Sequence, residues 1–294
     1  MEIRTDLALE AREKFEEDNV EIKGVVLTEE YVEESEIQIT KIVIETENGA
    51  RAMGRPKGTY ITIECPNMTE DEEESQSQIS RVLAKYIKSL LPKKDEEQSV
   101  LIVGLGNRDI TPDALGPVVA DNLLITRHVV KEYGKCATGK EKTNLISSIV
   151  PGVMAKTGME TVEIIKGIVK ETKPDIIIAV DALAARSTKR LNRTIQIADT
   201  GINPGAGVGN NRHAINIESV GVPVIAIGIP TVVDAATIVC DTINSMIDMK
   251  DYPTFRELLS PNLKGMFVTP KDVDETIKRL GFTVSEGINL ALEL

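Results

Sequence analysis

Two aspartates stand near the ends of short apolar runs, and their positions suggest acid–base chemistry. Asp113 follows the apolar start of Val100–Ala120, and Asp181 ends the apolar run within Pro174–Ala185. Runs of β-branched residues that are bounded by Gly or Pro and followed by a helical pattern are typical of buried parallel strands. In an open α/β sheet, ligands bind outside the carboxyl ends of such strands. Asp113 and Asp181 are therefore a candidate pair of catalytic carboxyls.

The two aspartates are expected to have different surroundings. Asp113 precedes a helical pattern that starts at Ala114, where free backbone N–H groups lower a carboxyl pKa; capping that helix is the alternative role. Burial at the end of an apolar strand raises the pKa of Asp181, and a second carboxylate nearby raises one pKa of the pair further. Two carboxyls that share one proton can deprotonate a water molecule and protonate a leaving group.

A glycine-rich segment is the second candidate feature. Gly205, Gly207 and Gly209 alternate within Gly201–Asn216, which permits backbone conformations that other residues avoid. The spacing is not G-x-G-x-x-G and no helical pattern follows, so a dinucleotide site is not indicated. We interpret the segment as a loop that borders the site.

His213 leaves two interpretations open. With Asp113 and Asp181 it would complete a set of one histidine and two carboxylates that suits a metal ion. Alternatively, it is a surface or hydrogen-bonded loop histidine, which one sequence without a spacing motif favours. Our prediction is a site that needs no metal and no cofactor.

The pattern of elements predicts an α/β fold with a mostly parallel central sheet flanked by helices. We expect a single domain over residues 1–294, with a β-rich N-terminal extension or insertion at 20–66 and the α/β core at 100–250. The expected strands of the extension are Val20–Leu27, Glu36–Glu45 and Thr59–Glu64, with a loop between the last two. Helices are expected at Ala114–Tyr133, Thr161–Glu171, Thr231–Ile247 and Pro270–Leu280.

Charge and composition limit the classes of molecule that this protein is expected to bind. The formal net charge of −12 disfavours nucleic acid and anionic membranes as partners but suits basic polypeptides. No apolar run approaches the length of a membrane span, and three scattered cysteines form no zinc motif, so we expect a soluble cytoplasmic protein. The run Val103–Asn107 also resembles the opening of peptidyl-tRNA hydrolases, but Arg108–Asp109 follows in place of their Pro-Gly, and the acidic charge does not suit tRNA.

Five ordered segments resemble the germination proteases of spore-forming bacteria. They are RTDLALEA (Arg4–Ala11), VGLGN-x-x-x-TPDALGP (Val103–Pro117), VDALAAR (Val180–Arg186), TGINPGAGVGNNR (Thr200–Arg212) and IGIPTVVDAATIV (Ile227–Val239). The resemblance implies an atypical aspartic endopeptidase whose essential aspartates are Asp113 and Asp181, with Asp109 as a non-catalytic loop residue. It also implies a fold like that of the hydrogenase maturation proteases and no dependence on metal.

The resemblance extends to processing and partners. It implies a zymogen that removes its own propeptide at a site with an acidic residue, a large apolar residue and Ala; Asp6-Leu7-Ala8 has that form, so cleavage would fall between Asp6 and Leu7. The implied substrates are small acid-soluble spore proteins, degraded in the spore core during germination, and the implied assembly is a homotetramer. Two alternatives stay open: a metal-dependent protease of the maturation type, and a non-catalytic acidic factor that binds a basic protein.

Overall fold

The computed structural model describes residues 6–10, 22–70, 72–93, 97–140, 142–209, 212–246, 263 and 265–294. In this part of the chain one nine-stranded sheet forms the centre, in the order β1-β2-β3-β7-β8-β6-β4-β5, with β9 paired to β8. The strands are β1 (Val25–Val32), β2 (Ile37–Ile44), β3 (Gly58–Glu64), β4 (Ser99–Gly104), β5 (Leu145–Ile149), β6 (Ile176–Ala185), β7 (Thr194–Ala198), β8 (Val224–Asp234) and β9 (Phe267–Val268).

The predicted α/β class is confirmed, and the sheet is mixed. Its parallel part is β8-β6-β4-β5, whose strands are nearly continuous runs of Ile, Val and Ala because helices cover both faces. The N-terminal β-rich extension is also present: β1, β2 and β3 are antiparallel and continue the same sheet through the pairing of β3 with β7.

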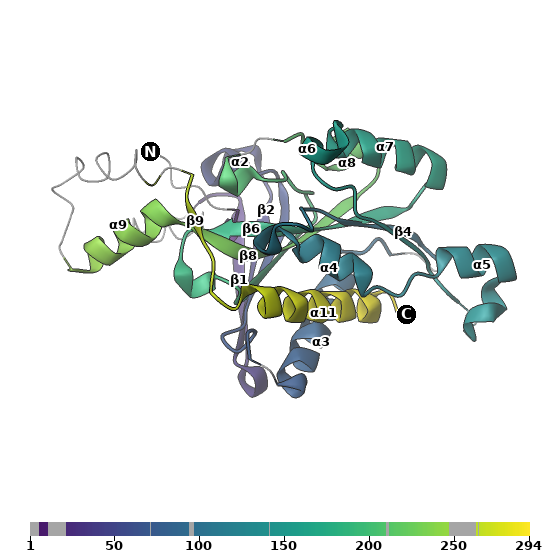
Figure 1. Cartoon of the computed structure of the whole chain (residues 1–294), viewed down its shortest axis with the longest axis horizontal. Helices are drawn as coiled ribbons and strands as arrows, with labels where there is room; N and C mark the ends of the chain where they lie inside the picture. The colour runs from purple at the N-terminus through teal and green to yellow at the C-terminus, as the bar shows by residue number, and fades with distance from the viewer. Residues whose placement is uncertain are drawn as a thin grey trace.

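Helices cover the two faces of the sheet (Figure 1). On one face α3, α4 and α11 pack together, and on the other lie α6, α7 and α8. Successive side chains of β6 point to opposite faces of the sheet, so this strand contributes to a hydrophobic core on each face. Ile178 and Val180 face the first group of helices, whereas Ile177 and Ala179 face α7 and α8. The helices are α2 (Glu47–Met53), α3 (Glu73–Leu90), α4 (Leu115–Asp121), α5 (Arg127–Tyr133), α6 (Met154–Thr157), α7 (Thr161–Thr172), α8 (Ile217–Val220), α9 (Ala235–Met246) and α11 (Val273–Ala291).

The helix predicted at Ala114–Tyr133 is wrong, because the segment forms two helices, α4 and α5. Between them, the Leu124 N–H donates to Asn289 Oδ1 of α11, and the Thr126 N–H donates to the Ile146 carbonyl of β5. These tertiary bonds replace the bonds that would have continued the helix.

Three further details differ from prediction. The loop expected before Thr59 contains α2, which Thr46 caps by accepting a hydrogen bond from the Gly49 N–H, 3.1 Å. Thr231 does not open a helix; β8 continues to Asp234, and α9 starts after it. The first strand begins at Val25 rather than Val20, which lies outside the described residues.

The described helices include none with the length and apolar character that a bilayer span requires. Of the cysteines, Cys65 is buried, and the side chains of Cys136 and Cys240 lie outside the described part.

Candidate active site

Asp181 lies within β6, just beyond the end of β4. The last residue of β4, Gly104, pairs with Val180, so Asp181 is the next residue along β6. Its side chain is buried, and its Oδ1 accepts a hydrogen bond from the Ala182 N–H, 2.9 Å. Burial raises the pKa of Asp181 well above the usual value, and the charges of Asp113 and Asp6 raise it further. This environment favours the protonated form of the carboxyl.

Asp113 ends a 3₁₀ turn, η2 (Thr111–Asp113), that is held against the sheet. The buried Thr231 hydroxyl of β8 donates to the Pro112 carbonyl, 2.6 Å, and the Asn107 N–H donates to the Asp113 carbonyl, 3.0 Å. Burial raises the pKa of Asp113 to about 6, although the Asn107 amide opposes this rise. The two predicted aspartates therefore interact electrostatically and have raised pKa values.

Close backbone packing brings η2 to the ends of β4 and β6. A methyl group on Gly116 would lie 2.3 Å from the Leu105 carbonyl oxygen and 2.5 Å from that of Val180. Gly106 has φ +115°, and a methyl group there would lie 1.9 Å from the Asp113 carbonyl oxygen. Only glycine fits at these two positions.

A third carboxyl, that of Asp6, lies beside the predicted pair. Its Oδ2 accepts a hydrogen bond from the Ala184 N–H of β6, 2.9 Å, and its own N–H donates to the Ala184 carbonyl, 3.2 Å. Burial raises the pKa of Asp6, whereas the N–H groups of Ala184 and Gly207 and the charge of Arg55 lower it. The N-terminal segment thus delivers an acidic side chain to the site of Asp181.

Asp6 and Asp181 line a cavity of about 370 Å³, whereas Asp113 is not part of its lining. Its walls come from β6, β7, β8 and the loops around residues 54 and 203. Its polar lining includes Asp6, Arg55, Tyr60, Asp181 and Gln196.

The predicted glycine loop reaches this cavity in part. Gly205 lines it, and Gly207 lies so close to Asp6 that a methyl group would lie 2.1 Å from Asp6 Oδ2. Gly209 is exposed, with φ +79°. The structure thus places Gly205 at the cavity and Gly207 beside Asp6, and the function of the loop stays a prediction.

His213 does not join the aspartates. Its side chain is 75% exposed, and its Nδ1 lies 3.8 Å from Glu160 Oε2. Among the described residues, no three His, Cys, Asp or Glu side chains are grouped as metal ligands would be. The structure therefore does not bring His213 together with Asp113 and Asp181; it is an exposed loop histidine whose Nδ1 lies near Glu160, the other of the two interpretations.

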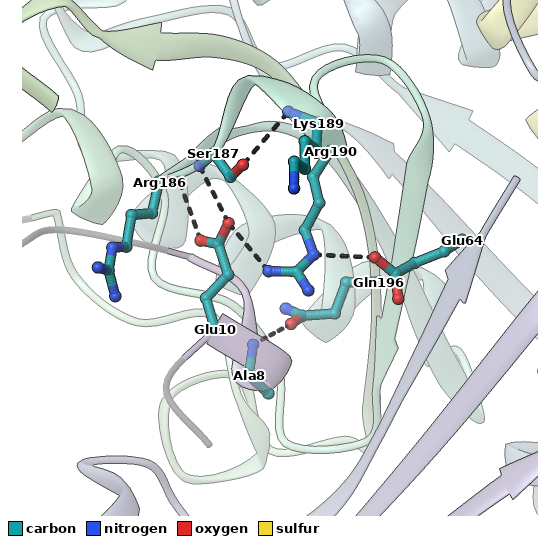
Figure 2. Close-up of polar contacts among 8 residues, drawn as sticks. All are labelled: Ala8, Glu10, Glu64, Arg186, Ser187, Lys189, Arg190 and Gln196. Atoms are coloured by element: carbon teal, nitrogen blue, oxygen red, sulfur yellow. Dashed lines mark hydrogen bonds and ion pairs between the residues drawn. The ribbon is translucent and has the colours of Figure 1, made fainter. Parts of the chain in front are cut away.

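The residues after Asp6 are held as tightly as a bound peptide. Leu7 is fully buried in an apolar pocket with Leu183, Ala185 and Val233. Gln196 Oε1 accepts a hydrogen bond from the Ala8 N–H, 2.5 Å (Figure 2).

The side chain of Glu10, further along the segment, is bound by a separate set of polar groups. Its buried carboxylate accepts hydrogen bonds from the N–H groups of Arg186, 2.9 Å, and Ser187, 3.2 Å, and lies 3.4 Å from Arg190 Nη1 (Figure 2). Arg190 Nε in turn donates to Glu64, 2.9 Å. Residues 1–5 of the predicted propeptide lie outside the described part.

The sequence did not indicate that Gln196, Thr231 and Arg190 contribute to the site. Gln196 lies in the alternating run TIQIA, where the polar position resembles a solvent-facing one. The signal that was available is Gly228, a glycine inside an apolar strand, which marks a close approach of other groups.

The fold and the paired carboxyls define an α/β protein with a candidate acid–base hydrolase site. A family model of germination proteases matches residues 2–254 of the chain. The germination protease of Caldanaerobacter subterraneus subsp. tengcongensis is 47% identical, with 99% of this chain and 94% of that protein covered. Those of Clostridium tetani and Bacillus mycoides are 45% and 39% identical, with 100% and 99% of this chain and 96% and 93% of those proteins covered.

The chain belongs to the germination protease family, so it is a spore germination endopeptidase that hydrolyses peptide bonds. Among solved structures, the [NiFe] hydrogenase maturation protease HycI from Thermococcus kodakarensis KOD1 is similar to this chain, with a TM-score of 0.34 and 17% sequence identity. The match covers 69% of this chain and 99% of that protein.

Proposed function

We propose that this endopeptidase is a zymogen that cleaves its own chain between Asp6 and Leu7 and then degrades small acid-soluble spore proteins. One observation carries the proposal: Asp6, the first residue of the predicted cleavage sequence, lines the same cavity as Asp181 and interacts with it electrostatically. The same segment fills the subsites that a substrate would need, so the intact chain blocks other substrates. The proposed setting is the spore core, and the proposed assembly is a homotetramer.

The pKa shifts support different catalytic roles for Asp113 and Asp181. Asp113, with a pKa of about 6, is ionised at neutral pH and acts as the base, whereas Asp181 keeps its proton and acts as the acid. Because the two groups interact, the proton belongs to the pair and its titration has two apparent pKa values.

The reaction then proceeds in two balanced steps. Water adds its oxygen to the Asp6 carbonyl carbon, gives one proton to Asp113, and the carbonyl oxygen takes the proton of Asp181. The resulting diol collapses: the C–N bond breaks, the Leu7 nitrogen takes the proton from Asp113, and a diol hydroxyl returns a proton to Asp181. The products are a carboxyl group on Asp6 and a free amine on Leu7, and the pair again holds one proton.

A test of the proposal uses the chain that starts at Leu7 as the enzyme. Incubated with a synthetic peptide that copies residues 1–12, it should release a fragment that begins with Leu-Ala, as read by mass spectrometry. The intact chain should cleave the same peptide at least tenfold more slowly, because its own segment occupies the site. Equal rates for the two forms would contradict the blocked zymogen, and stable binding without new peptide ends would favour the non-catalytic binding factor.

We expect Glu10→Gln to slow self-cleavage by about 10–100-fold. The change leaves Arg190 beside a neutral amide in a buried setting, and breaking one side of a buried ion pair costs several kcal/mol. The measurement is the first-order rate at which the Leu7 product forms. Glu293→Gln, which removes an exposed ion pair with Lys88, is the matched control and should leave that rate unchanged. Equal rates for both variants would show that the Glu10 subsite does not hold the segment.

The rate of self-cleavage should show a bell-shaped dependence on pH. Asp113 has a raised pKa of about 6, so its base form is lost below that pH, and the rate should fall about tenfold per pH unit there. At higher pH the rate falls again as Asp181 ionises, since its pKa is raised by burial, Asp113 and Asp6. A rate that stays constant between pH 4.5 and 6 would rule out Asp113 as the base.

A further inference from the structure

Gln196 and Asp181 lie on the same face of the sheet, on either side of Gly228. Gln196 of β7 and Asp181 of β6 both pair with Gly228 of β8, which lies between them. Residues that pair across neighbouring strands point to the same face, so both side chains project over Gly228. Gly228 has no side chain, and the Leu183 side chain packs against it, so that a methyl group there would lie 2.5 Å from Leu183 Cδ1. The backbone of the N-terminal segment lies beside Gln196, which contacts the Asp6 carbonyl.

The amide of Gln196 contacts both sides of Leu7. Its Nε2 donates a hydrogen bond to the Asp6 carbonyl oxygen, 3.0 Å. Its Oε1 accepts one from the Ala8 N–H, 2.5 Å (Figure 2). A backbone carbonyl only accepts and a backbone N–H only donates, so these two partners determine which end of the amide is nitrogen. The oxygen that Nε2 contacts belongs to the peptide bond between Asp6 and Leu7.

We propose that Gln196 is a catalytic residue that stabilises the charge on the carbonyl oxygen of the cleaved peptide bond. The inference rests on the proposed cleavage after Asp6. When water adds to the carbonyl carbon, electrons move to this oxygen, and the Nε2–H bond strengthens as its charge grows. The oxygen has two lone pairs, so it accepts from Nε2 and takes the proton of Asp181 at the same time.

The second contact gives the same side chain a positioning function. The Oε1 bond to the Ala8 N–H fixes the chain on the leaving side of the cleaved bond. One planar amide thereby holds the two peptide groups that flank Leu7 at a set distance. Peptide substrates that bind in trans would offer the same carbonyl and N–H groups, so Gln196 acts on any residue sequence that fits the neighbouring pockets.

Self-cleavage of the full-length chain tests the proposal directly. The segment is already docked, so the first-order rate at which the Leu7 product forms reports the chemical step rather than substrate binding. Gln196→Met removes the donor and should lower this rate by about 10²–10³-fold, the usual effect of losing one such donor. The matched control is Gln98→Met, another buried glutamine, whose Nε2 donates to the Pro92 carbonyl away from the cavity; it should stay within about threefold of the wild-type rate.

Gln196→Glu separates a catalytic function from a structural one. A protonated glutamate can donate to the Asp6 carbonyl and accept from Ala8, as the amide does, whereas the ionised form only accepts. The rate of this variant relative to wild type should therefore be near one at low pH and fall about tenfold per pH unit above the glutamate pKa. The charged and titratable groups that line the cavity with it are Asp6, Asp181, Arg55 and Tyr60.

The outcomes are distinct. A folded Gln196→Met chain that cleaves at the wild-type rate, or a Gln196→Glu ratio that does not change with pH, would overturn the proposal and leave the aspartate mechanism in place. If Gln196→Met does not fold, as judged by circular dichroism, the pH dependence of Gln196→Glu decides alone. If the wild-type chain forms no Leu7 product, the proposed function fails and this inference fails with it.

Discussion

Replacing Asp181 with asparagine is expected to slow formation of the Leu7 product by at least about 10³-fold. The amide cannot give a proton to the Asp6 carbonyl oxygen, and the paired acid and base each contribute about 10²–10⁴-fold. Asp113→Asn should have a similar effect because it removes the base. The measurement is mass spectrometry of the full-length chains over time at pH 6 to 7.

A change in stability cannot account for such a loss. The raised pKa of Asp113 means that its ionisation costs stability: this cost is absent below about pH 4 and is complete once the pH has risen through about 6. Asp113→Asn removes the cost, so its melting temperature at pH 7 should exceed that of wild type, and the difference should vanish below pH 4. An inactive but more stable variant would show that the carboxyl serves chemistry rather than folding.

Asp109 is the matched control for these two substitutions. It lies four residues before Asp113, is exposed, and forms an ion pair with Lys156. Asp109→Asn should leave the rate of self-cleavage within about twofold of wild type, because surface ion pairs contribute little. A large loss at Asp109 together with a wild-type rate in Asp181→Asn would reverse the assignment.

Gly116→Ala is expected to destabilise the fold by about 3 kcal/mol or more and to abolish self-cleavage. The added methyl group would lie 2.3–2.5 Å from backbone atoms of Leu105 and Val180, which cannot move without shifting β4 or β6. Such a shift would separate η2, and with it Asp113, from Asp181. Urea unfolding followed by circular dichroism measures the loss as a lower midpoint.

Gly167→Ala provides the contrast within the same chain. Gly167 is an exposed position in α7, and a methyl group there meets no atom within 4 Å. Alanine favours the helix by about 0.5–1 kcal/mol, so this variant should unfold at a higher urea concentration than wild type. Equal effects of the two substitutions would show that the close packing around Gly116 does not hold the site together.

Local patterns were sufficient to predict the parallel strands and to place Asp113 and Asp181 near the carboxyl ends of two of them. The run before Asp181 is apolar over its whole length and β-branched at every position except Ala179, and β6 is buried on both faces as such a run predicts. Asp113 follows a strand that ends in glycine, and the chain turns there into η2. These features depend on neighbours in sequence, which is why one sequence is enough to infer them.

Features that depend on distant residues were not predictable in this way. The break between α4 and α5 is set by Asn289 of α11, and Gln196 meets its partner Asp6 across 190 positions of sequence. The residue type of His213 left open whether it joins the aspartates at a metal ion or is a loop histidine, and in the structure its Nδ1 lies 3.8 Å from Glu160 Oε2. Residue type and local pattern contain no information about such pairings.

The most direct test of the central claim is the mass of the purified full-length chain after incubation at mildly acidic pH. The account predicts a new species that begins at Leu7 in the wild type and its absence in both Asp113→Asn and Asp181→Asn. A chain that stays intact in the wild type, or that is cut after Asp6 in the two variants as well, would contradict self-cleavage by this pair of aspartates.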